Sequence, residues 1–165
     1  NINGVDVIRI GVPEFAKTDK FSRIRNILVY FLRAAYITGK VGKVDYVLSV
    51  SQPPILGGLL GVWGKLRKKG TGGKRAKYIY QIQDFNPEQA MTVNYCKNSI
   101  VTGLMMALDK YSCRKADLII TVGRDLMETL EKRFKHGTFP KALMINTWTD
   151  EKVIFPHPPD NKKVL

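Results

Sequence analysis

The chain has 165 residues, with 27 Lys and Arg against 14 Asp and Glu, which gives a formal net charge of +13. The 44% hydrophobic content excludes intrinsic disorder as the main state, and two cysteines exclude a disulfide scaffold and favour a reduced, cytoplasmic setting. The longest apolar run, 27–36, is far shorter than the ~20 residues that span a bilayer. The high positive charge indicates a polyanionic partner.

The first half of the chain alternates between strand and helix patterns. A strand is predicted over 5–12, ended by Pro13, and a helix follows from a cap at Thr18 or Asp19 to Gly39. A nearly continuous apolar run over 44–50 is typical of a strand covered on both faces. The helix residues that recur on one face, and that we expect to be buried, are Phe21, Ile24, Leu28, Phe31, Leu32 and Ala35.

The middle of the chain continues the alternation. A turn at 51–54 leads into a helix over 55–68, a basic, glycine-rich loop over 65–75 and a strand over 78–83. Four glycines weaken the helix, and close packing against the sheet explains them best. They are Gly57, Gly58, Gly61 and Gly64.

The second half repeats the pattern with a helix over about 96–115, a strand over 117–122, a short helix from Gly123 and a strand over 143–145. We expect one stripe of the long helix and one face of the short helix to point inward. The stripe is Cys96, Ile100, Leu104, Leu108 and Tyr111, and the face is Leu126, Leu130 and Phe134.

Five alternations of strand and helix predict an α/β fold, a Rossmann-like three-layer domain with a mainly parallel sheet and right-handed crossovers. We expect this domain over 1–155 and an extended tail over 156–165. Ligands of open parallel sheets bind beyond the carboxyl ends of the strands, so the loops of interest are 51–54, 84–88, 123–125 and 146–150.

These loops carry several candidate binding residues, each with a simpler structural alternative. Asp84 follows a buried strand and could accept hydrogen bonds from sugar hydroxyls, with Glu88 beside it, or could support an Asx turn. Ser51 and Gln52 precede a helix N-terminus that suits a phosphate or a sugar oxygen, or simply cap that helix.

At the next helix start, Gly123 lets the backbone approach a ligand and Arg124 could meet an anion, although a tight strand-to-helix turn explains the glycine equally well. No phosphate-loop string is present, and Cys96 and Cys113 have no histidine at metal-ligand spacing. We expect His136 and His157 to be exposed and without a catalytic role.

Basic residues gather around the first helix and in the glycine-rich loop. Together with exposed apolar side chains such as Tyr30, they favour adhesion to an anionic membrane surface, and an ordinary solvated face is the alternative. Nucleic acid is a weaker candidate, because aromatic residues are not interleaved with the basic ones. The expected membrane-surface residues are Lys20, Arg23, Arg33, Lys65, Arg67, Lys68 and Lys69.

Four segments, taken in order, resemble the N-terminal domain of glycosyltransferase family 4 enzymes, which have the GT-B fold, and are closest to bacterial cell-surface polysaccharide enzymes of the colanic-acid type. The first two segments are Asp45 to Pro54, a strand and Pro-Pro turn, and Gln83 to Glu88, an acidic loop. The other two are Lys115 to Gly123, a strand, and Ile145 to Asp150 with Phe155-Pro156 after it.

The resemblance implies half of a two-domain enzyme that transfers a sugar from a nucleotide-sugar donor to an acceptor with retention of configuration, without a metal or other cofactor. By that match Asp84 lines the acceptor side of the cleft as the catalytic candidate. By the same match Gly123 and Asn146 line the cleft between the two domains. The candidate substrate-binding residues, from loop position and match together, are Ser51, Gln52, Pro53, Glu88, Gly123, Arg124 and Asn146. The acceptor is expected to be a lipid-linked saccharide at the cytoplasmic face of the cell membrane, with no nucleic acid as partner.

Departures from the family pattern limit what the chain is expected to do alone. Gln83 stands where a basic residue is common, and Asn86 where tryptophan is common. The usual first strand and the second domain are not within the sequence, which starts at Asn1, so we expect a fragment that does not catalyse transfer by itself. The alternatives are a non-catalytic basic α/β module for nucleic acid or a nucleotide, and an interaction domain that uses the basic helix.

Overall fold

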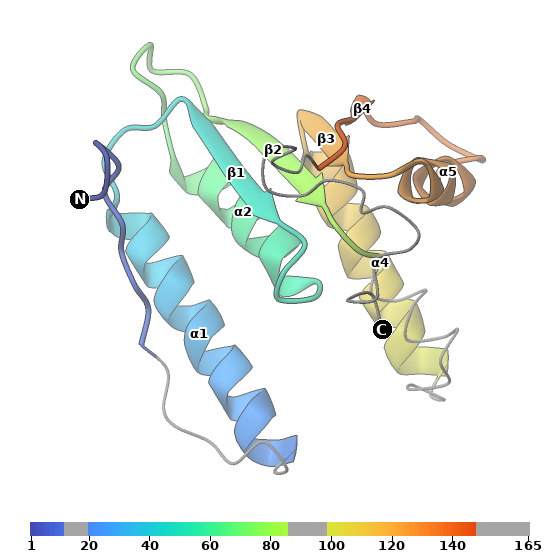
Figure 1. Cartoon of the computed structure of the whole chain (residues 1–165), viewed down its shortest axis with the longest axis horizontal. Coiled ribbons are helices and arrows are strands. Elements are labelled where there is room, and N and C mark those ends of the chain that lie inside the picture. The colour runs from blue at the N-terminus through green and yellow to red at the C-terminus, as the bar shows by residue number, and fades with distance from the viewer. Residues whose placement is uncertain (12–19, 86–98, 148–165) are drawn as a thin grey trace, which may run out of the picture.

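The computed structural model describes residues 1–11, 20–85 and 99–147, and it confirms the predicted α/β class, consistent with a Rossmann-like fold (Figure 1). Helices flank a parallel sheet of four strands. In chain order the elements are α1 (Lys20–Lys40), β1 (Tyr46–Val50), α2 (Leu56–Arg67), β2 (Lys77–Ile82), α4 (Ser99–Lys115), β3 (Leu118–Thr121), α5 (Arg124–Arg133) and β4 (Ala142–Met144).

The sheet has the spatial order β1-β2-β3-β4, so each strand pairs in parallel with its neighbour in the sequence. The register places Leu48 opposite Ile79, and Ile120 opposite Leu143. Because every crossover steps in the same direction and parallel crossovers are right-handed, the connecting helices are expected on one face of the sheet.

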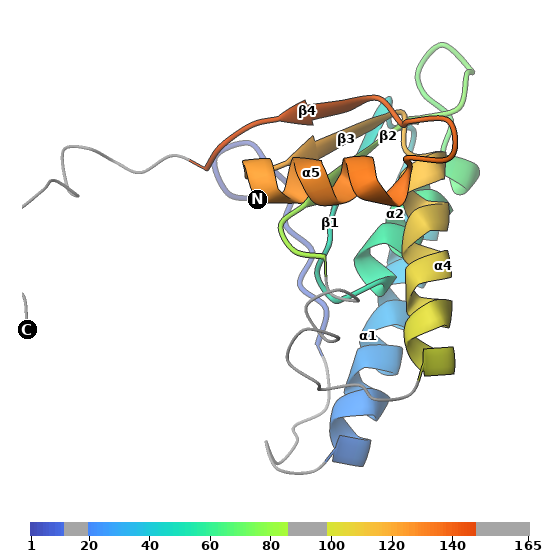
Figure 2. The same ribbon diagram turned by 90° about the vertical axis from the view of Figure 1, so that its right-hand side faces the viewer.

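The buried core confirms that the connecting helices lie on one face of the sheet. Alternate residues of β2, Tyr78, Tyr80 and Ile82, are at most 1% exposed. They form one apolar cluster with residues from all three connecting helices, among them Val62 of α2, Cys113 of α4, Leu126 and Leu130 of α5, and Phe134 directly after α5. The prediction that these α5 residues point inward is therefore confirmed, and one helical layer covers one side of the sheet (Figure 2).

Close packing explains the glycines of α2, as predicted. A Cβ atom on Gly61 would overlap the ring of Tyr78, and one on Gly58 would lie 2.8 Å from the Cβ of Ser112. The backbone of α2 can therefore approach both β2 and α4 only because these positions carry no side chain.

The predicted strand over 5–12 is wrong in the described part of the segment. Residues 2–5 form a tight turn with an isolated antiparallel bridge between Ile2 and Val5, and Asn3 and Gly4 both have positive φ. Residues 6–11 pair with no strand, and the Gly11 carbonyl instead accepts a hydrogen bond from Arg33 of α1. β-branched residues favour extended backbone, but a strand also needs a partner for its backbone groups.

The expected inward face of α1 is also wrong. Ile24, Leu28 and Leu32 are 58%, 51% and 66% exposed, whereas Asn26 and Ala34 are buried. Ala34 is the smallest of these residues, so its side of α1 can lie closest to the rest of the fold. The apolar stripe marks a face that the described chain leaves exposed.

The long helix α4 shows the same reversal. Leu104 and Tyr111 are 60% and 41% exposed, while Asp109, Ser112 and Cys113 are buried. Tyr80 already fills the space between the sheet and α4, and its hydroxyl donates to Asp109, so small and polar residues turn inward.

The strand at 46–50 was expected to be covered on both faces, but Tyr46 and Leu48 are 68% and 58% exposed on the side away from the helices. The last strand begins one residue earlier than predicted. Thr18, Asp19, Glu88, Cys96 and the tail 156–165 lie outside the described residues.

Candidate functional site

The carboxyl ends of the four parallel strands bring the predicted loops to one edge of the sheet. Ser51 follows β1, Asp84 comes two residues after β2, and Gly123 comes two residues after β3. Asn146 follows β4, whose end is tied to β3 by the hydrogen bond from Ile145 N to Thr121 O. The prediction that these loops share an edge therefore holds for the described loops.

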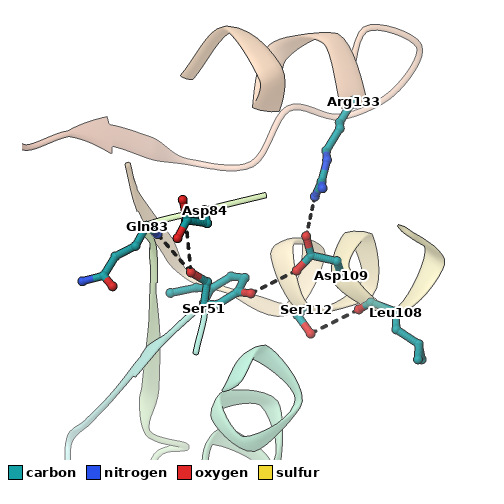
Figure 3. Close-up of polar contacts among 8 residues, drawn as sticks. Ser51, Gln83, Asp84, Leu108, Asp109, Ser112 and Arg133 are labelled. Atoms are coloured by element: carbon teal, nitrogen blue, oxygen red, sulfur yellow. Dashed lines mark hydrogen bonds and ion pairs between the residues drawn. The ribbon is translucent and has the colours of Figure 1, made fainter. Parts of the chain in front are cut away.

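Ser51, in the loop after β1, is hydrogen-bonded to the loop after β2 (Figure 3). The side chain is buried, and its Oγ accepts hydrogen bonds from Gln83 N at 3.0 Å and from Asp84 N at 3.4 Å. A buried hydroxyl with two backbone donors orders the neighbouring loop. Ser51 thus positions the backbone of Asp84. The alternative that Ser51 or Gln52 caps the next helix is wrong, because the N-cap of α2 is Ile55 and no side chain caps that end.

The turn after Ser51 is strained at one residue. Ile55 has φ 65 and is buried, and a β-branched residue in the left-handed region is uncommon. Pro53 and Pro54 carbonyls accept the first hydrogen bonds of α2, from Gly57 N and Leu56 N. Such strain persists only where the surroundings hold it, and it is frequent at ligand-binding sites.

A cavity of about 360 Å³ opens beside this turn, between α1, β1 and α2. Its lining includes Ile10, Tyr30 and Ala34 on one side and Ser49 and Gln52 on the other. Its volume lies in the lower range of small-molecule pockets. Of the predicted site residues, Gln52 is in its lining.

Asp84 is half-buried, and the next residue anchors it from the other side. Phe85 is 2% exposed, and the guanidinium of Arg133 lies 3.9 Å from the centre of its ring. Arg133 Nη1 also contacts Asp109 Oδ2 at 2.5 Å, in an ion pair whose side chains are 4% and 6% exposed. The loop of Asp84 is therefore clamped between Ser51 and this buried pair.

The pair is completed by Tyr80, whose hydroxyl donates to Asp109 Oδ1 at 3.0 Å. Burial, and then the Asp109 carboxylate, raises the pKa of Tyr80 far above its usual value, so the hydroxyl stays protonated and donates. The sequence reasoning missed this network. Its signal was Asp109 itself, the one carboxylate within an otherwise acid-free helix.

The remaining predicted residues that the structure describes lie in the loops at the same edge. Gly123 has extended φ and its carbonyl accepts from Met127 N, as an ordinary helix start requires. Arg124 and Asn146 are exposed, and Pro53 is half-buried.

Several basic residues predicted for a membrane surface make internal contacts instead. Lys65 pairs with Asp117 at 2.9 Å, and Lys68 is buried with its ammonium on the carbonyls of Gly39 and Val41. Although burial acts to raise the pKa of Asp117, the Tyr78 N–H and Lys65 outweigh it and lower that pKa.

Among the seven predicted basic residues, the structure therefore removes Lys65 and Lys68 from the free surface, and Arg33 donates to Gly11. Arg67 and Lys69 are exposed as predicted, whereas the side chains of Lys20 and Arg23 lie outside the described part.

Within residues 1–11, 20–85 and 99–147, no group of three or more His, Cys, Asp and Glu side chains is arranged to hold a metal ion. Over the same residues, no helix combines the length and the apolar character needed to cross a bilayer.

Comparison with known proteins gave no match to this chain among family models, curated proteins or solved structures.

Proposed function

We propose that this chain is the acceptor-binding portion of a retaining glycosyltransferase that moves a sugar from a nucleotide-sugar to a lipid-linked saccharide in the synthesis of cell-surface polysaccharide. The proposal starts from the four segments that resemble family 4 enzymes. The observation that carries it is Asp84 itself, held at the carboxyl edge by Ser51 on one side and by Phe85 and Arg133 on the other.

This arrangement suits recognition of hydroxyl groups. A carboxylate fixed by its backbone can accept hydrogen bonds from an acceptor sugar without first losing side-chain and loop entropy. The cavity beside Gln52 provides a pocket of saccharide size next to the same edge. Asp84 is the candidate to contact the acceptor hydroxyl, and the nucleotide-sugar would be bound chiefly by a second domain.

The proposed location is the cytoplasmic face of an anionic cell membrane, where a lipid-linked acceptor is accessible. The net charge of +13 supports it, because each basic residue near such a surface contributes about 1 kcal/mol of attraction.

Calorimetric titration of the chain with prenyl-diphosphate monosaccharides in detergent tests the proposal. Wild-type protein should bind one member of such a panel, and Asp84→Asn should weaken that binding roughly tenfold or more, the loss expected for a hydrogen bond to a charged group. Glu131→Gln, an exposed carboxylate of α5, is the matched control and should bind like wild type.

Two results would contradict the proposal. Equal affinity of Asp84→Asn and wild type removes Asp84 from the site. Binding of nucleic acid with a steep salt dependence, and of no saccharide, would favour the basic binding module instead.

A further inference from the structure

The three helices α1, α2 and α4 present one outer surface with an unusual composition. They lie side by side and run in the same direction, with α2 in the middle (Figure 1). They contain five, two and three Lys and Arg residues, and Asp109 is their single carboxylate. Because Asp109 is buried against Arg133, the three helices themselves expose no acidic side chain, and Asp117, which follows α4, is paired with Lys65 of α2.

Large apolar side chains project from the same surface. Leu28 and Leu32 of α1, Leu66 of α2 and Leu104 of α4 are 50–66% exposed. Between α1 and α2 an apolar groove of about 340 Å³ is lined by Phe31, Ala35, Leu59, Val62, Trp63 and Leu66. Exposed leucines on neighbouring helices beside an apolar groove are typical of an interaction surface.

Each of the three helices also ends in an aromatic residue paired with a basic residue four positions later. Lys40 lies 4.5 Å from the Tyr36 ring, Arg67 lies 5.1 Å from the Trp63 ring, and Lys115 lies 5.6 Å from the Tyr111 ring. These pairs form an aromatic and cationic belt along one end of the apolar surface. Rings with one wet edge and adjacent cations are typical of the water–lipid boundary.

We propose that this three-helix surface docks on an anionic lipid bilayer, with the leucines and the α1–α2 groove among the acyl chains and the belt at the headgroups. The inference rests on the membrane location in the proposed function and names the surface responsible for it. Aliphatic side chains insert into lipid, while the cations of the belt, Lys40, Arg67 and Lys115, attract anionic headgroups.

The positive charge of this surface favours a bilayer over a second copy of the chain as its partner. A symmetric dimer through this surface would bring Lys40, Arg67 and Lys115 close to their own copies, and like charges across an interface are destabilising. A bilayer with anionic headgroups neutralises them.

The test is sedimentation of the chain with vesicles of phosphatidylcholine containing 0–50% phosphatidylglycerol. Leu32→Asp places a carboxylate on the surface at an exposed position, and Thr138→Asp, in the exposed loop after α5, adds the same charge elsewhere. Wild type and Thr138→Asp should bind anionic vesicles alike, and Leu32→Asp should bind roughly tenfold more weakly. Tyr36→Glu, also on the surface, provides an independent second variant should Leu32→Asp fail to fold.

A spectroscopic readout follows the surface directly. In a Trp148→Phe background Trp63 is the only tryptophan, and its emission should shift to the blue on adding anionic vesicles. Equal vesicle binding by Leu32→Asp and wild type would overturn the proposed surface while leaving saccharide binding through Asp84 unaffected. A dimer that Leu32→Asp dissociates, without vesicle binding, would assign the surface to a second copy instead.

Discussion

At the scale of single residues, the contact between Asp109 and Arg133 is an ion pair with both side chains buried. It joins α4 to α5, and through Tyr80 and Phe85 it reaches β2 and the loop of Asp84. A buried pair of this kind adds little net stability, but removing one partner leaves an uncompensated charge. The main effect of the ion pair is therefore to fix the position of the Asp84 loop.

This gives a prediction for a double-mutant cycle. Arg133→Met should lower the free energy of unfolding by about 3–5 kcal/mol, because Asp109 is left charged and buried. Asp109→Asn in combination with Arg133→Met should recover most of that loss, since the amide keeps an acceptor for Tyr80. Urea unfolding followed by circular dichroism measures both, and additive effects of the two substitutions would contradict the coupling.

Sequence reasoning reached part of this site. The positions of Ser51, Asp84, Gly123 and Asn146 at one edge follow from a strand–helix alternation, because parallel strands place their carboxyl ends together. The contact between Asp109 and Arg133 could not be predicted from the sequence, because the two residues are 24 positions apart and meet only in the folded chain.

At the scale of elements, α2 depends on its glycines in a way that α4 does not. The Cβ of an alanine at position 61 would enter the Tyr78 ring, whereas one at position 103 of α4 would meet nothing within 4 Å. Packing therefore requires a glycine at position 61 but leaves room for a side chain at position 103.

Gly61→Ala should destabilise the fold by about 1–3 kcal/mol through overpacking, with a shift of α2 away from β2. Gly103→Ala should instead stabilise it by about 0.5–1 kcal/mol, because alanine restricts the unfolded chain and favours the helix. Thermal unfolding of the two variants beside wild type checks the pair, and a shift of the same sign in both would contradict it.

The helices also show where periodicity alone misleads. The apolar stripes of α1 and α4 were assigned to the core, yet Leu32 and Leu104 face outward. Periodicity identifies an apolar face but not what covers it. For α4, the bulky Tyr80 of the sheet leaves room only for small or polar side chains on the inner face of the helix. For α5, with its strongly polar opposite face, the same reasoning was correct.

At the scale of the whole molecule, charge is poorly balanced. With a net charge of +13, folding brings like charges closer together than they are in the unfolded chain. Self-repulsion of this kind destabilises the compact state at low ionic strength.

Raising sodium chloride from about 10 mM to 200 mM should therefore raise the melting temperature, because the Debye length falls from roughly 30 Å to below 10 Å. Differential scanning calorimetry measures the change, and an equal concentration of an uncharged osmolyte provides the control for non-ionic effects. A melting temperature independent of salt would show that the positive charges are already compensated within the fold.

The order of the strands has a consequence for how the chain folds. Since each strand pairs with the next one in the sequence, the sheet needs no long-range strand to be inserted between two others. Every strand–helix–strand unit can add to the one before it, as in a repeat array, and contacts close over moderate chain separations. The sheet can thus assemble stepwise from either edge, and a break at one end leaves the pairing of the remaining strands intact.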